Sequence, residues 1–395
     1  MAIIKSALRS ANSLSAIAKN ITLFIGKTVS KQAVHKRINS AFVNFVQSLL
    51  ALAILEKAQI DINGNSKLFK HFTDVNIQDS TNIPLSEHLA SYFPGAKNGS
   101  NKKNASLKIQ TIFSVLKERF VHFSITPFTS NDQSQANEIL KYAPKASLVI
   151  RDLGYFTLES LAYLDKAGIY FLSLLRHNTN VYDAKTEKKL DLLRLLKKKN
   201  YLDIDVIIGE KKRLKTRLIA LPVDEKTAQK RREKAKYDRD RRLNHDKNYL
   251  SLLAWTIFVT NVNRDIWSAK DALKAYQIRW RIEIIFKTWK SAFHIDLISS
   301  PSKNMVLAFV YTMLLFITLF TLNIYDRIVY MIKSQNLDVQ ISLIKLARYI
   351  ADLDLVPYAL IYTKQFLEQY FQQIIYFCAY EKRKDRQNYS QLLAP

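Results

Sequence analysis

The stretch YQIRWRIEIIFKTWK, residues 276–290, places four polar side chains at a regular spacing: Tyr276, Arg279, Glu283 and Lys290. An α-helix turns about 100° per residue, so on one helix these side chains share a stripe roughly 60° wide. The apolar residues of the stretch fall on another side of the helix. A carboxylate flanked by cations and a phenol can bind a metal ion while its neighbours contact phosphates. The spacing therefore predicts a single helix that presents a metal-binding carboxylate to a phosphate backbone.

An ordinary solvated helix would show a similar pattern. Arg279 and Lys287 each lie four residues from Glu283. Such pairs usually stabilise an exposed helix by about 0.2–0.5 kcal/mol each, with no further role. The spacing alone does not separate this interpretation from a metal site, so the rest of the chain has to decide.

Two more acids come at the predicted ends of strands. Asp79 ends a run with a period of two, and Asp152 follows a short apolar run at 147–150. With Glu283 on the helix, three carboxylates on one mixed sheet could hold two divalent ions. The chain has one cysteine, Cys378, and seven scattered histidines. A metal site would therefore use carboxylates, which favour Mg²⁺ or Mn²⁺.

The N-terminal region is predicted to be helical and contains the segment FIGKTVSKQAVHKRI. Gly26 can form a turn there, and Ser30 can cap a second helix over residues 31–38. That helix would carry Lys36 and Arg37, together with Gln32 and His35. A helix-turn-helix that enters a DNA groove fits this pattern, and so does a plain basic helical hairpin.

Alternating and apolar runs indicate the elements that would hold the acids in place. Ser268 is expected to cap the helix that carries Glu283, and a helix is expected at 131–143. Strands are expected at 107–116, 120–126, 147–150 and 169–175, within 203–223, and at 252–262. The region 301–395 is predicted to be mostly apolar helix.

The net charge of +26 indicates a polyanionic partner, either nucleic acid or an acidic membrane surface. The basic run at 226–247 is interpreted as a DNA-backbone contact, with a solvated helix as the alternative. The apolar run at 305–322 is long enough to span a bilayer. Its tyrosine and threonines, and the charged helix before it, favour a buried core helix, so no membrane association is expected.

Other function classes are disfavoured by composition. The chain has only seven glycines and no glycine-rich phosphate loop, which argues against a nucleotide-driven motor or a hydride-transfer enzyme. The first residues, MAIIKSALRS, lack an apolar segment long enough for a signal peptide. We therefore expect a cytoplasmic, nucleoid-associated protein that uses no nucleotide.

At these residues the chain resembles a known family. Tyr276, Arg279, Glu283 and Lys290 match the YREK signature of the "IS-four" group of insertion-sequence transposases, which share a DDE catalytic core. Two further blocks resemble the family's first and second aspartate blocks, and a Thr-Asn pair typical of the family precedes the last helix. The two blocks are DSTNIPL at 79–85 and DLGYF at 152–156, and the pair is Thr260-Asn261. The resemblance covers roughly residues 65 to 330.

The resemblance implies an α/β fold with an RNase H-like mixed-sheet catalytic core at 63–300. A largely β insertion would interrupt this core at about 155–250. Helical regions would flank it, with an N-terminal DNA-binding region at 1–62 and a C-terminal region at 301–395.

The resemblance also implies a metal-binding catalytic triad of Asp79, Asp152 and Glu283. Asp74 competes with Asp79 for the first position, but Asp79 carries the Thr-Ile-Pro-Leu continuation. The triad would bind Mg²⁺, with Mn²⁺ as a substitute, and would act by a two-metal mechanism.

The implied reaction is cut-and-paste transposition: cleavage at the element ends, then strand transfer to target DNA. The partners would be DNA with terminal inverted repeats, target DNA and a second copy of the chain, as a homodimer on DNA. Members that cut through a hairpin hold a flipped base with a tryptophan, and Trp255 is the candidate here, with an ordinary core aromatic as the alternative. The DNA-binding candidates are Tyr276, Arg279, Lys290, Trp255, Lys36 and Arg37.

Three other functions remain open. A catalytically inactive DNA-binding relic or inhibitor of transposition would share the fold. A standalone nuclease would share the chemistry without strand transfer. A membrane-associated basic protein would use the apolar run.

Overall fold

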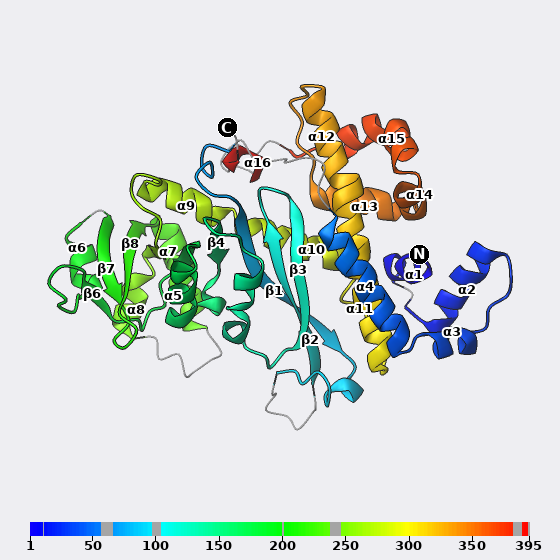
Figure 1. The fold of residues 1–395 in the computed structure, drawn as a ribbon, viewed down its shortest axis with the longest axis horizontal. Coiled ribbons are helices and arrows are strands. Elements are labelled where there is room, and N and C mark those ends of the chain that lie inside the picture. The colour runs from blue at the N-terminus through cyan, green and yellow to red at the C-terminus, as the bar shows by residue number, and fades with distance from the viewer. Residues whose placement is uncertain are drawn as a thin grey trace. The chain divides into compact units, whose positions relative to one another are not determined.

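The computed structural model describes residues 1–10, 12–56, 66–96, 104–199, 201–237, 246–381 and 389–393. The chain forms two compact units (Figure 1). Unit 1 comprises residues 1–66, 79–131 and 280–394, and unit 2 comprises residues 67–78 and 132–279. The chain therefore crosses between units after Ser66, inside strand β1, after Asn131, and between Arg279 and Trp280.

Unit 1 begins with the predicted helices. They are α1 (Ala2–Leu8), α2 (Leu14–Ile25), α3 (Lys31–Arg37) and α4 (Ser40–Leu55). Gly26 ends α2 in the left-handed region, with φ at 69°, which glycine adopts without a Cβ penalty. The Ser30 side chain accepts a hydrogen bond from the Ala33 N–H and caps α3. The predicted turn and cap are thus confirmed.

An antiparallel hairpin forms the sheet of unit 1 together with the second half of β1 (Val75–Leu85). Its strands are β2 (Ala105–Ser114) and β3 (Arg119–Pro127), in the order β3-β2-β1. The turn between them includes Glu118, a non-glycine residue with φ at 49°. The two strands predicted at 107–116 and 120–126 are confirmed.

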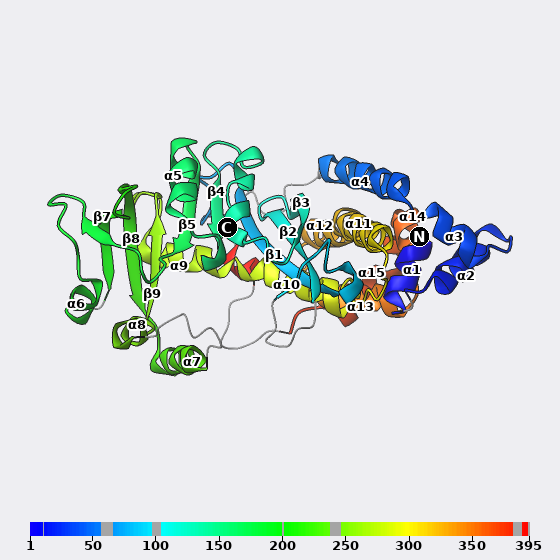
Figure 2. The same ribbon diagram turned by 90° about the horizontal axis from the view of Figure 1, so that it is seen from below.

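The C-terminal part of unit 1 is helical, as predicted. Its helices are α10 (Trp280–Ser291), α11 (Lys303–Phe320), a π-helical turn (Thr321–Tyr325), α12 (Asp326–Ser334), α13 (Leu343–Asp352), α14 (Val356–Ile361), α15 (Thr363–Cys378) and α16 (Tyr389–Leu392). The helix Lys303–Ser334 is apolar and long enough to cross a membrane, yet 72% of its most apolar window is buried inside the protein. It lies alongside α4 (Figures 1 and 2). This supports the predicted buried core helix.

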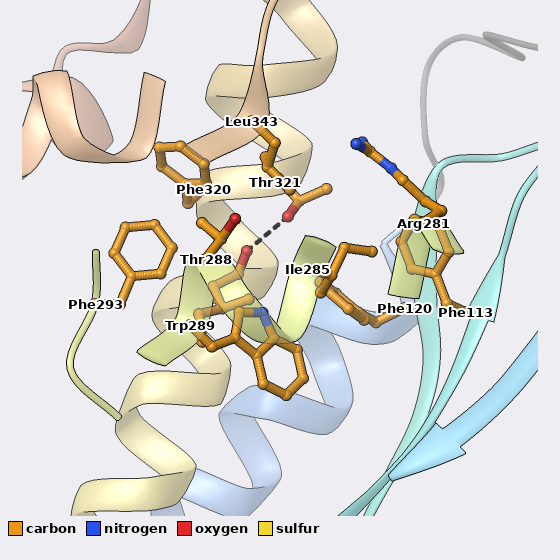
Figure 3. Close-up of a pocket in the computed structure, with 11 residues that line it drawn as sticks. Phe113, Phe120, Arg281, Ile285, Thr288, Trp289, Phe293, Phe320, Thr321 and Leu343 are labelled. Atoms are coloured by element: carbon orange, nitrogen blue, oxygen red, sulfur yellow. Dashed lines mark hydrogen bonds between the residues drawn. The ribbon is translucent and has the colours of Figure 1, made fainter. Parts of the chain in front are cut away.

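The buried face of α10 packs against the hairpin and α11 (Figure 3). Trp289 lies with its ring centroid 5.7 Å from that of Phe120 and 5.9 Å from that of Phe123. The void left between these elements is only ≈ 10 Å³, about the smallest space that holds one water molecule. The face is therefore close-packed.

Unit 2 is built on a mixed sheet. Strands β1, β4 and β5 run parallel, and β5, β9, β8, β7 and β6 are joined by antiparallel pairs in that order. The bounds are β4 (Leu148–Arg151), β5 (Tyr170–Leu174), β6 (Val181–Asp183), β7 (Leu202–Ile208), β8 (Leu214–Pro222) and β9 (Trp255–Thr260). The predicted α/β class, with a large mixed sheet and helical flanks, is confirmed.

The helices of unit 2 occur between and after these strands. They are α5 (Leu158–Lys166), α6 (Leu192–Lys197), α7 (Glu225–Lys236), α8 (Lys247–Leu252) and α9 (Ala269–Gln277). Ser268 and Asp271 form a capping box at the start of α9, so the predicted cap is confirmed. The segment predicted as a largely β insertion, 155–250, contains four strands and four helices among its described residues.

The prediction of one helix over 276–290 is wrong. Helix α9 ends at Gln277 and α10 begins at Trp280. The N–H groups of Ile278 and Arg279 donate to carbonyls three residues back, at 3.2 and 3.1 Å. This tighter turn interrupts the 3.6-residue period, so the single stripe becomes two shorter faces.

Two smaller predictions are also wrong. Residues 131–143 form two short 3₁₀ turns, Asp132–Gln135 and Glu138–Lys141, because a run of Asn, Asp and Ser side chains competes for backbone bonds. Asp79 lies inside β1 rather than at its end, since the strand continues through Leu85 beside β2.

Candidate active site

The first two acids are linked to one strand pair in unit 2. In the parallel pairing of β1 with β4, Gln78 lies opposite Arg151. Asp79 directly follows Gln78 in the chain, and Asp152 directly follows Arg151. Each acid is therefore one residue beyond a paired position.

Backbone hydrogen bonds orient both carboxylates. The half-buried Asp79 accepts a bond from the Ser80 N–H at its Oδ1, at 2.7 Å. Asp152 caps the 3₁₀ turn Leu153–Tyr155 and accepts from the Gly154 N–H, also at 2.7 Å. A Cβ on residue 154 would lie 3.0 Å from Asp152 Oδ1, so glycine leaves room for this carboxylate. Asp74, by contrast, is buried ahead of β1.

Arg151 is a buried cation that the sequence did not identify. Its guanidinium donates to the Ala136 carbonyl at 2.8 Å, to Ser160 Oγ at 3.1 Å and to the Gln78 side chain at 3.4 Å. Burial lowers the pKa of Arg151 to about 10. A buried charge without a charged partner is costly, so Arg151 needs the hydrogen bonds that it makes. The bond to Gln78 connects the residue before Asp79 to the residue before Asp152.

Glu283 is exposed in the first turn of α10. The partial positive charge of a helix N-terminus stabilises a carboxylate at this position. Lys290, seven residues further on the same helix, is about 20° from Glu283 around the axis. The two side chains therefore share one face of α10.

Tyr276 and Arg279 belong to unit 2. The guanidinium carbon of Arg279 lies 5.7 Å from the centre of the Tyr276 ring, in cation–π geometry. The Tyr276 ring lies 5.1 Å from that of Phe258 on β9. The structure thus places Tyr276 and Arg279 in contact in unit 2, and Glu283 and Lys290 on one face of α10 in unit 1.

A second residue that sequence reasoning missed is Arg281, which forms a buried ion pair with Glu118. Its Nε and Nη2 contact the two carboxylate oxygens at 2.8 and 3.3 Å, and each side chain is 3% exposed. The sequence did contain one indication of a separate role. On an ideal helix Arg281 lies about 140° from Tyr276, away from the polar stripe.

The donor set suits a divalent cation by its chemistry. Carboxylate oxygens are hard ligands of the kind that Mg²⁺ and Mn²⁺ prefer. Asp79 and Glu283 belong to unit 1, and Asp152 belongs to unit 2. Among the described residues, no group of three or more His, Cys, Asp or Glu side chains lies close enough to hold an ion.

The predicted DNA-binding residues of the N-terminal region lie on α3. Val34 is buried, while Gln32, His35, Lys36 and Arg37 are exposed. The helix thus has one anchored side and one basic solvent-facing side.

Trp255 lies at the start of β9 and lines a surface pocket of ≈ 520 Å³ in unit 2. Lys197, Lys199 and Arg232 also line this pocket. Arg231 donates to the Trp255 carbonyl at 3.0 Å and so fixes the backbone of the tryptophan. The part of the basic run that the structure describes includes α7, while residues 238–245 lie outside the described residues.

Comparison with known proteins identifies the family. The family model for the transposase DDE domain matches residues 70–319, more than half of the chain. The chain belongs to this family. The match extends from just before β1 nearly to the end of α11, so it includes the candidate acids Asp79, Asp152 and Glu283.

Two transposases are similar to this chain. The transposase for insertion sequence element IS231D of Bacillus thuringiensis subsp. finitimus is 30% identical over 304 residues, covering 72% of this chain and 63% of that protein. The transposase for IS1151 of Clostridium perfringens is 29% identical over 318 residues, covering 75% and 67%. With the IS231F transposase the match covers 61% of the relative, so the chain spans less than two thirds of the first two IS231 relatives.

Among solved structures, the piggyBac transposase synaptic complex with hairpin DNA aligns with a TM-score of 0.45 at 10% identity, covering 98% of this chain and 76% of that chain. Membership of the DDE domain family implies a requirement for a divalent metal cation. The expected resemblance to a DDE transposase is confirmed at the level of the family.

Proposed function

We propose that the chain is an active transposase of the "IS-four" group, which cuts DNA at the ends of its element and joins the cut ends to target DNA. The observation that carries the proposal is the match of a transposase DDE domain across the segment that holds Asp79, Asp152 and Glu283. The strand register next to the first two acids and the exposure of the third are consistent with it.

Asp79, Asp152 and Glu283 would hold the divalent ions, with Mg²⁺ as the cation and Mn²⁺ as a substitute. Bound ions would activate the attacking hydroxyl and stabilise the leaving oxygen of a phosphodiester. The backbone bonds to Asp79 and Asp152 leave these carboxylates oriented before any ion binds. Glu283 lies in the first turn of α10, where the partial positive charge of the helix N-terminus favours a carboxylate.

The cations near Glu283 would hold the DNA. Arg279 suits a two-point contact with a phosphate, and the Tyr276 ring beside it limits how far its guanidinium can move. Lys290 would contact a second phosphate along the same face as Glu283. Such contacts give affinity and register on the duplex rather than sequence specificity.

Two other surfaces would extend the DNA contact. Lys36 and Arg37 on α3 would enter or flank a groove of the terminal repeat. Trp255 would stack on an unpaired base if cleavage passes through a hairpin, and the lysines of its pocket support contact with an adjacent phosphate. A homodimer on the paired element ends and a cytoplasmic, nucleoid-associated location belong to the same proposal.

The central test uses the purified chain, Mg²⁺ and DNA that carries the terminal repeats flanking its gene. We expect Glu283→Ala to abolish strand cleavage while binding of the ends is retained, because the substitution removes a metal ligand without removing a cation. Glu368→Ala is a matched control, since Glu368 is also an exposed glutamate on a helix of unit 1. Cleavage by Glu283→Ala would refute the assignment.

The same assay separates the alternatives. An inactive relic or inhibitor would bind the ends without cutting them in the wild-type chain. A standalone nuclease would cut without joining ends to target DNA. Wild-type cleavage followed by strand transfer is the outcome that supports transposition.

A further inference from the structure

The buried pair of Glu118 and Arg281 joins the turn of the β2–β3 hairpin to the first turn of α10. The arginine makes two contacts with one carboxylate, at 2.8 and 3.3 Å. Two aromatic rings cover the guanidinium, with centroids 5.2 Å away for Tyr325 and 4.8 Å away for Tyr389. Four segments of unit 1 that are distant in sequence therefore meet at one side chain.

The geometry of this contact fixes more than the distance between the two elements. A planar guanidinium that donates two bonds to a carboxylate defines an orientation, which a single point charge does not. Apolar packing along the rest of α10 is non-directional and tolerates small rotations more easily. Glu118 itself has a left-handed backbone, which persists only where the surroundings hold it firmly.

Arg281 and Glu283 are two residues apart in the same helical turn, so their side chains diverge by about 200° around the axis. The first is buried and the second is exposed. Rotation of α10 about its axis would therefore move both side chains together. Holding Arg281 on the inside sets the direction in which Glu283 points on the outside.

We infer that Arg281 is a positioning residue for Glu283, and that its two-point contact with Glu118 sets the rotation of the first turn of α10 for metal binding. This inference rests on the proposed role of Glu283 as a metal ligand. Arg281 touches neither substrate nor metal, and acts through the helix.

The test compares Arg281→Met and Arg281→Lys with a matched control elsewhere in the chain. Arg217 in unit 2 is also buried, at 4% exposure, and contacts Asp203 at 2.8 and 2.6 Å. Arg217→Met therefore removes a buried arginine that makes the same kind of two-point contact, in unit 2 rather than on α10. Cleavage of terminal-repeat DNA is measured per folded protein, in Mg²⁺ and in Mn²⁺, together with binding of the uncut ends.

For Arg281→Met we expect cleavage in Mg²⁺ to fall at least about ten-fold while end binding stays within about two-fold. Mg²⁺ demands near-ideal octahedral geometry, so a displaced ligand should cost more in Mg²⁺ than in Mn²⁺. Arg281→Lys, which keeps the charge but not the fork, should fall between Arg281→Met and the wild type. Arg217→Met should leave the Mg²⁺ to Mn²⁺ ratio unchanged.

Two results would overturn the inference. One is equal cleavage and equal metal preference in Arg281→Met and Arg217→Met. If Arg281→Met does not fold, Glu118→Gln keeps the size of the side chain, but its amide nitrogen cannot accept the second bond from Arg281. Wild-type Mg²⁺ dependence in that variant would also overturn the inference. Failure of the proposed function looks different, because Glu283→Ala would then cleave or the wild type would not.

Discussion

The Glu118–Arg281 pair makes a stability prediction that does not depend on catalysis. The perturbation is a double-mutant cycle with Glu118→Leu, Arg281→Met and the combination. Each single change leaves one group in a site where both partners are 3% exposed. An uncompensated charge in such a site costs about 3–5 kcal/mol, whereas apolar replacement of both partners is often neutral or stabilising.

The two single variants should differ in their dependence on pH. Glu118→Leu leaves a guanidinium that cannot lose its proton in a protein, so its cost should be nearly constant from pH 5 to pH 8. Arg281→Met leaves a carboxyl whose pKa burial already raises, and removes the arginine charge that opposes the rise. At a pH below the pKa of the unfolded state, this carboxyl is protonated in both the folded and the unfolded state. At a higher pH the unfolded state loses the proton, whereas the buried carboxyl of the folded state retains it. The cost of Arg281→Met should therefore grow as the pH rises.

The assay is urea unfolding of the full chain at pH 5 and pH 8, with hydrogen exchange of the α10 amides to locate the change. The exposed pair of Lys364 and Glu368, with side chains 81% and 62% exposed, serves as the reference. Its removal should cost about 0.3–0.5 kcal/mol. If Glu118→Leu and Arg281→Met cost no more than this reference, the pair is hydrated and the reasoning is refuted.

Two further predictions concern other groups. The buried carboxyl of Asp326 has no hydrogen-bond partner among the described residues, and burial, with the nearby Glu118 charge, raises its pKa well above the usual value. Since the folded state then retains a proton that the unfolded state loses, Asp326→Asn should stabilise the protein at pH 8 and have little effect at pH 4, which calorimetry can check. Replacing Lys36 and Arg37 together by alanine should flatten the slope of log K against log salt by about 1.8 and weaken end binding about 30-fold at 0.15 M salt. An unchanged slope, equal to that of Lys364→Ala, would rule out phosphate contact by α3.

Local signals in the sequence were sufficient for the N-terminal helices. Gly26 and Ser30 carry their own reasons for ending and starting a helix, namely a positive φ and a side-chain acceptor. The hairpin and the short strand before Asp152 were likewise marked by alternation and apolar runs. Elements of this kind can be predicted because the deciding contacts lie within a few residues.

The break between α9 and α10 has no such signal. Neither glycine nor proline lies near it, and helical spacing continues through it. Ile278 is fully buried, and the chain passes from unit 2 to unit 1 directly after Arg279. Tertiary packing thus overrides a local pattern that is favourable to one continuous helix.

The Glu118–Arg281 pair was invisible for a related reason. Its two residues are 163 positions apart, and the sequence around each gives no indication of the other. The sequence suggested three acids and their order, but the register that pairs Gln78 with Arg151 is a property of the folded sheet. The sequence therefore offered candidate catalytic residues, which stay a prediction, while Arg151 and Arg281 were found only in the structure.

The split of the helix changes the interpretation of the spacing of Tyr276, Arg279, Glu283 and Lys290. If the four side chains lay on one helix, the turn of about 100° per residue would explain their spacing. That explanation fails because the helix is interrupted at Ile278. The helical period still accounts for the spacing within each unit. Tyr276 and Arg279 contact each other in unit 2, and Lys290 follows Glu283 by nearly two full turns on α10. The interval from Arg279 to Glu283 is different, because it spans the boundary between the units. Its length is therefore set by the covalent connection between the cation proposed to bind phosphate and the acid proposed to bind metal, and Arg281 lies in the middle of that connection.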